Sequence, residues 1–118
     1  MGLDQVWITQ EKDSSEEQVL FQHRKVPALE EFMAEKWVAL NPGKRLKEFN
    51  CEKLPITLDL LNELREVIRD NMLNPDATGF FWGYHVPGEH DAEILEALEE
   101  AETAIVDRDA TVYYTSWW

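Results

Sequence analysis

Apolar and polar residues alternate in several segments of the chain, which is the pattern of a β-strand with one buried face. Residues 3–10 show this period, and residues 19–24 repeat it after a polar turn, so the two segments predict a hairpin. A frayed helix over residues 16–21 is the alternative for the second segment. Residues 110–118 are rich in aromatic and β-branched side chains, and they predict a strand held inside a sheet.

Two further segments have the character of strands. Residues 79–84 read G-F-F-W-G-Y, and we expect a strand that continues to Val86. Its composition predicts that it pairs with the strand of residues 110–118 at the centre of one sheet. Residues 44–56 predict a short edge strand, because Pro55 is tolerated only at an edge or at a strand end.

Three other segments place apolar residues at helical spacing. The first begins at Pro27 and stops before the turn formed by residues 41–43. The second covers residues 58–73 with Thr57 as its N-cap, and the third follows Asp91, which we expect to cap it. The solvent face of the first helix is expected to carry Glu30, Glu31 and Glu35.

A helix with one apolar stripe must lie on another element, so the pattern predicts an α+β fold. We expect a single domain over residues 1–118, a two-layer sandwich in which a mostly antiparallel sheet of four to five strands packs on three helices. Large rings fall on both faces of the aromatic strands, whereas three helices in one layer cover only one face. A loop of the chain, a second copy of it or a partner protein is therefore expected on the other face.

Charge and composition restrict the classes of function. The chain has 24 acidic and 11 basic residues and a formal net charge of −13, which argues against direct binding of nucleic acid. The only basic cluster is Lys44, Arg45 and Lys47. The single cysteine, Cys51, cannot form an internal disulfide and is expected to be a small buried residue of a protein in a reducing compartment. No apolar run is long enough to cross a membrane, so we expect a cytoplasmic protein.

Two groups of side chains are candidates for binding a partner protein or a second copy of the chain. The third helix is strongly acidic, and the spacing of its glutamates brings several of them within reach of one face. The aromatic strands supply the other group. The predicted partner-binding residues are Glu93, Glu96, Glu99, Glu100, Trp82, Tyr84, Trp117 and Trp118. The alternative is that the glutamates only keep the protein soluble.

One cluster has the residue types that bind divalent metals: His85, Glu89, His90 and Asp91. An open metal site there could activate water. The alternative is that Asp91 caps the helix and the histidines are surface residues. His23, beside Arg24 and Lys25, is also expected at the surface. No catalytic or cofactor motif is present, so no catalytic residue is assigned and no cofactor is expected.

Four short motifs resemble a family of small uncharacterised bacteriophage and prophage proteins. They are M-G-L-D at the start, H-R-K ahead of a helix that carries a tryptophan, T-G-F-F-W-G, and the ending Y-Y-T-S-W-W. Members of that family begin M-G-L-D before a strand, carry a G-F-F-F-G-like segment after a helix and end on Y-Y-x-S-S-W or a near variant. The resemblance spans almost the whole chain and implies an accessory phage protein in the bacterial host cytoplasm, but it carries over no active site.

Members of this family are sometimes labelled phosphoglycerate kinase-like, and that activity does not fit this chain. A kinase must cradle phosphate oxygens with backbone N–H groups, basic side chains and a metal, whereas this chain has no glycine-rich phosphate loop. We therefore expect a non-enzymatic protein that binds a host or phage protein and acts as an acidic inhibitor. The alternative is a small metal-assisted hydrolase.

Overall fold

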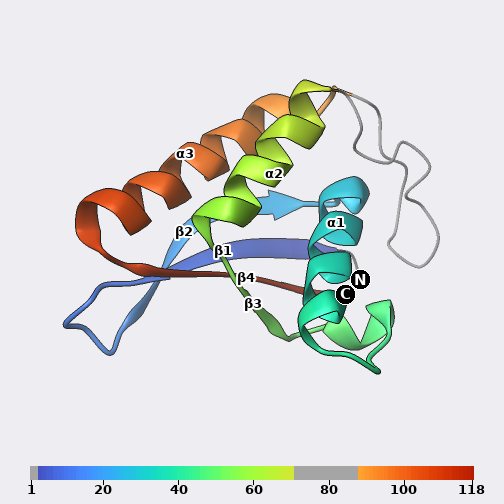
Figure 1. The fold of residues 1–118 in the computed structure, drawn as a ribbon, viewed down its shortest axis with the longest axis horizontal. Helices are drawn as coiled ribbons and strands as arrows, with labels where there is room; N and C mark the ends of the chain where they lie inside the picture. The colour runs from blue at the N-terminus through green and yellow to red at the C-terminus, as the bar shows by residue number, and fades with distance from the viewer. Residues whose placement is uncertain (1–2, 71–87) are drawn as a thin grey trace.

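The computed structural model describes residues 3–70 and 88–118, which form an α+β fold of two layers (Figure 1). One layer is a four-stranded antiparallel sheet, and the other contains three α-helices. Helices α2 (Leu58–Arg69) and α3 (Asp91–Arg108) lie across one face of the sheet, and α1 (Pro27–Leu40) lies near the end of the sheet where its last strand ends. This arrangement confirms the predicted fold class.

The strands of the sheet lie in the order β2 (Glu17–Arg24), β1 (Asp4–Gln10), β4 (Thr111–Trp117) and β3 (Lys53–Pro55). Strands β1 (Asp4–Gln10) and β2 (Glu17–Arg24) form the predicted hairpin, which contains a bulge beside Trp7. The alternative of a frayed helix in this region is therefore wrong. Strand β4 (Thr111–Trp117) is paired along its whole length with β1, which confirms that the aromatic ending is held inside a sheet.

Strand β4 has neighbours on both sides, because β3 (Lys53–Pro55) pairs with its second edge. The backbone bonds from Cys51 N–H to Ser116 and from Ile56 N–H to Val112 extend that contact. Both edges of β4 are therefore occupied by β1 and β3, whereas the predicted partner of β4 was the aromatic segment 79–84. The segment 79–84 itself lies outside the described residues.

Three α-helices and one 3₁₀-helix are described: α1 (Pro27–Leu40), η1 (Leu46–Phe49), α2 (Leu58–Arg69) and α3 (Asp91–Arg108). The Thr57 side chain accepts a hydrogen bond from the Leu60 N–H at 3.1 Å, as predicted for the N-cap of α2. Residues 71–73, the predicted end of this helix, lie outside the described residues. The N-cap of α3 is His90, so the expectation that Asp91 caps it is wrong; Asp91 is instead the first helical residue.

The core fills the space between the helices and the inner face of the sheet, where the side chains alternate inward. Trp7 and Tyr114, on neighbouring strands, are both fully buried, and their rings meet edge to face at a centroid distance of 5.6 Å. Phe49 of η1 stacks on Tyr114 at 6.1 Å. The helices complete the core with Leu29, Met33, Leu61, Leu64, Ile94 and Leu98. These contacts fix α1, η1 and the sheet as one packed unit.

The outer face of the sheet carries the side chains of the opposite alternation, among them Tyr113 and Trp117. Trp117 is 45% exposed, and Lys53 lies over the Tyr113 ring at 5.4 Å while it pairs with Glu17. No helix among the described residues packs there. Rings therefore occur on both faces of β4, and cover from a second copy or a partner stays a prediction.

The position of Cys51 corrects the expectation that this residue is buried. Cys51 is exposed, and its φ of 67° places it in a tight turn between η1 and β3, so the expectation of a buried cysteine is wrong.

Within residues 3–70 and 88–118, none of the helices combines the length and apolar character that crossing a bilayer requires.

Candidate functional site

The outer surface of α3 brings together three of the predicted partner-binding residues. Glu96, Glu99 and Glu100 are exposed and, with Thr103 and Arg108, line a shallow depression of about 300 Å³. Their spacing of three and four residues places them on one side of the helix. We call these three glutamates the acidic face of α3.

Glu93, the fourth predicted glutamate of this helix, does not belong to the acidic face. Its two carboxylate oxygens each lie 2.5 Å from an imidazole nitrogen, one on His23 and the other on His90. Burial alone would raise the pKa of Glu93, but hydrogen bonds to both histidines outweigh this effect and hold the pKa below its usual value. Glu93 thus connects the first turn of α3 to β2.

His23 is buried, with only 4% of its surface exposed, so the expectation of a surface histidine is wrong. The Trp7 indole N–H donates to its Nε2 at 2.8 Å. Because an indole nitrogen can only donate, Nε2 carries no proton, and Nδ1–H donates to Glu93. Burial lowers the pKa of His23, although Glu93 acts in the opposite direction, and this agrees with a neutral ring. The cluster ties β1, β2 and α3 together.

The predicted metal site is only partly described. His85 lies outside the described residues, Glu89 is exposed, and Asp91 is the first residue of α3. His90 points its Nδ1 to Glu93. In the part of the chain that the structure describes, no three His, Cys, Asp or Glu residues are arranged to hold a metal ion. The structure therefore gives no support from these residues to a metal-assisted hydrolase.

Of the predicted aromatic residues, Trp117 and Trp118 are described, and Trp82 and Tyr84 are not. Trp117 is on the outer face of the sheet. The backbone N–H of Trp118 donates to the Asn50 Oδ1 at 3.1 Å, and this bond fastens the end of β4 to the turn after η1. A loose ending is excluded by these contacts.

A buried polar network that the sequence interpretation missed lies between α1 and β4. The Tyr114 hydroxyl donates to Glu30 Oε1 at 2.7 Å, and the Ser116 hydroxyl donates to Glu30 Oε2 at 2.5 Å. Gln5 completes the network by donating to the Tyr114 oxygen at 2.8 Å. Glu30 is fully buried, so its predicted place on the solvent face is wrong.

Ionisation of Glu30 is unfavourable in this environment. Burial raises the pKa of Glu30 to about 7, although the hydrogen bonds from Ser116 and Tyr114 favour the ionised form. Burial and the nearby Glu30 also raise the pKa of Tyr114 well above its ordinary value, so its hydroxyl keeps its proton and remains a donor. The network is consistent with a structural role, because each polar atom named has a partner.

Comparison with known proteins adds no family to this picture: no protein-family model matches the chain, and neither a curated protein nor a solved structure is significantly similar to it.

Proposed function

We propose that this chain is a phage or prophage accessory protein that works without catalysis in the bacterial cytoplasm, by binding a basic protein through the acidic face of α3. The observation that supports this proposal is the exposure of Glu96, Glu99 and Glu100 on one side of the helix. None of the three forms an ion pair with another described residue. The phage origin rests on the resemblance of its short motifs.

Like charges at a spacing of three or four residues destabilise a helix slightly. The neighbouring cations do not relieve this repulsion, because Arg65 pairs with Glu102 and Arg108 pairs with Glu11. A lysine- or arginine-rich surface would supply the missing countercharge. The net charge of −13 would also speed the encounter with such a surface by electrostatic steering.

Exposed apolar side chains accompany the acidic face. Leu95 and Val106 are 37% and 59% exposed on the outer side of α3. Protein interfaces combine apolar contacts with charged groups at their rim, so this surface has both components. A partner that normally binds phosphates would present the required basic groove, and the carboxylates would compete with phosphates there. Such competition would make the protein an acidic inhibitor.

The test is affinity capture from a bacterial lysate with three versions of the protein. One is the unchanged chain, and one carries Gln at all three positions of the acidic face. The matched control carries Asp13→Asn, Glu16→Gln and Glu66→Gln, which remove the same charge from exposed sites elsewhere.

We expect the unchanged chain and the control to capture the same basic protein, and the acidic-face variant to lose it. Calorimetry with the purified partner should show that affinity falls as salt increases, because salt screens exposed charges. Capture that is equal for all three versions would contradict the proposal.

A further inference from the structure

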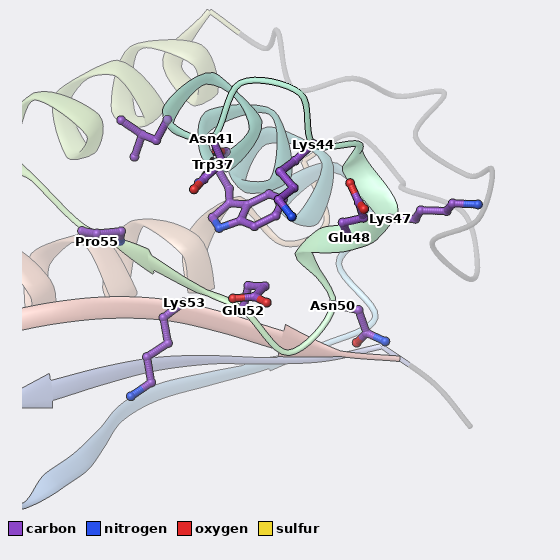
Figure 2. Close-up of a pocket in the computed structure, with 10 residues that line it drawn as sticks. Trp37, Asn41, Lys44, Lys47, Glu48, Asn50, Glu52, Lys53 and Pro55 are labelled. Atoms are coloured by element: carbon purple, nitrogen blue, oxygen red, sulfur yellow. Dashed lines mark hydrogen bonds between the residues drawn. The ribbon is translucent and has the colours of Figure 1, made fainter.

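A second surface feature, formed by elements other than α3, is an open pocket of about 790 Å³ at the end of α1 (Figure 2). It lies between the C-terminal turn of α1, η1 and β3, and its volume is in the range typical of small-molecule sites. Trp37, Lys44 and Glu52 line it together with the apolar side chains of Leu40 and Pro55. The pocket thus combines apolar walls with a few polar groups.

Trp37 supplies a hydrogen-bond donor that no described residue accepts. Its side chain is held by packing against Phe49, with ring centroids 5.6 Å apart, and the residue is only 6% exposed. Figure 2 shows the indole nitrogen on the side of the ring that faces the pocket. The described residues offer no acceptor to this N–H group. Among the described residues the only fully buried side-chain N or O atom without a partner is Thr9 Oγ1, so the Trp37 N–H is accessible from the pocket and can donate to an acceptor on a ligand.

Lys44 and Glu52 place opposite charges in the same pocket. Neither side chain forms an ion pair within residues 3–70 and 88–118. Lys44 points its ammonium toward the space beside the indole (Figure 2). One cation and one anion are therefore available to a ligand.

The other charged residues of the lining are already engaged or turned away. Lys53 pairs with Glu17 at 2.5 Å on the outer face of the sheet. Glu48 accepts a hydrogen bond from the backbone N–H of Arg45 at 2.6 Å. Lys47 extends away from the pocket in Figure 2. The chemistry of the site is thus set by Lys44, Glu52 and the indole.

We propose that this pocket binds a small zwitterion of the amino-acid type. The ligand carboxylate accepts hydrogen bonds from the Lys44 ammonium and the Trp37 indole N–H, and the ligand ammonium donates to the Glu52 carboxylate. An apolar side chain of the ligand packs against Leu40 and Pro55. This assignment gives a role to Lys44 of the basic cluster. It is independent of the proposed partner protein.

Three matched probes test the contributions of the ligand's carboxylate and ammonium separately. L-leucine carries both, 4-methylpentanoate has the same carbon chain with the carboxylate alone, and L-leucinamide has the ammonium alone. Each is titrated into the protein at constant ionic strength, and the two-dimensional ¹H–¹⁵N NMR signal of the Trp37 indole is followed. We expect a saturable shift with L-leucine and weaker binding of both analogues.

Two variants test which side chain of the pocket binds which charge of the ligand, and a third variant is the control. The Lys44→Gln variant should bind both L-leucine and 4-methylpentanoate about tenfold more weakly, because each ligand loses one charge-assisted hydrogen bond. The Glu52→Gln variant should bind L-leucine about tenfold more weakly than the unchanged protein, because it loses one charge-assisted hydrogen bond. It should bind 4-methylpentanoate at least as well, because a carboxylate that repels this anion is gone. Lys12→Gln removes an exposed lysine that pairs with Asp109 outside the pocket, and it should leave all three affinities unchanged.

Three results would overturn the proposal. The first is the absence of a saturable Trp37 shift with L-leucine, and the second is equal affinity for L-leucine and 4-methylpentanoate. The third is an equal loss of affinity in the Lys44 and Lys12 variants, which would show that only the overall charge of the protein matters.

Discussion

Replacing Glu30 by glutamine removes a carboxyl group whose ionisation the fold opposes. The group is fully buried between α1 and β4, and burial raises its pKa from 4.5 to about 7. One pKa unit corresponds to about 1.4 kcal/mol, so a shift of this size makes the ionised group cost about 3 kcal/mol of folding free energy. Glutamine keeps an oxygen that accepts from Tyr114 and an amide that donates to Ser116.

The sign of the pH dependence follows from which state holds the proton. Between pH 4.5 and about 7 the unfolded chain releases the Glu30 proton while the folded protein keeps it. This contribution to the free energy of unfolding is therefore complete below pH 4.5, falls as the pH rises through this window and is lost above it. Glutamine does not titrate, so a Glu30→Gln variant lacks this contribution.

The assay is urea unfolding of the unchanged protein, Glu30→Gln and the control Glu66→Gln, which changes an exposed glutamate of α2. The measured quantity is the difference in free energy of unfolding between each variant and the unchanged protein. From about pH 4.5 to about pH 8, this difference should move in favour of Glu30→Gln by about 3 kcal/mol and remain flat for the control. A flat difference for Glu30→Gln would refute the reasoning.

Three further substitutions test the N-cap of α2, the packing of the core and the tautomer of His23. Thr57→Ala should lower the free energy of unfolding by about 1 kcal/mol because α2 loses its N-cap oxygen, and Thr57→Ser should retain it; chemical denaturation measures both. Leu64→Ala should cost about 2–5 kcal/mol because this side chain is fully buried, whereas Leu40→Ala, at a residue 63% exposed, should cost under about 0.5 kcal/mol in the same assay. Trp7→Phe should raise the pKa of His23, since Nε2 no longer accepts the indole N–H and can bind a proton; an NMR titration that finds the same pKa would count against the assigned tautomer.

Local patterns in the sequence predicted the type and position of the described elements. Alternation located β1, β2 and β4, and helical spacing located α1, α2 and α3. Pro27 and Thr57 fixed two helix starts because their backbone and side-chain chemistry acts within a few residues. The neighbours of each strand were harder to predict, because pairing joins segments that are far apart in the sequence, and no local pattern indicates that β1 and β3 flank β4.

The burial of Glu30 could have been read from its spacing but not from its residue type. It lies three residues after Pro27 and seven before Trp37, which places it on the buried stripe of α1. A carboxylate is normally exposed, and its partners Tyr114 and Ser116 are more than 80 residues away in the sequence. Only the folded structure shows that the position of Glu30 on the buried stripe, and not its charge, decides whether it is buried.

The same distance limited the prediction of the candidate site. The spacing of Glu96, Glu99 and Glu100 within one helix was enough to group them. The same spacing includes Glu93, but it could not show that this carboxylate is engaged by His23, which comes from β2, 70 residues earlier. The pocket beside Trp37 also depends on elements that meet only in three dimensions, so the basic cluster alone could not define it.

The pairing of β1 with β4 has a consequence for how the molecule forms in a cell. Asp4 lies opposite Trp117, so the two middle strands of the sheet are contributed by opposite ends of the described sequence. Contacts between such distant residues form slowly, because a long loop must close before they stabilise anything. During translation the β1–β2 hairpin emerges before β4, and one edge of β1 stays unpaired until β4 leaves the ribosome. Chaperones that shield apolar strands should therefore associate with the nascent chain in that interval, and release should follow the arrival of β4.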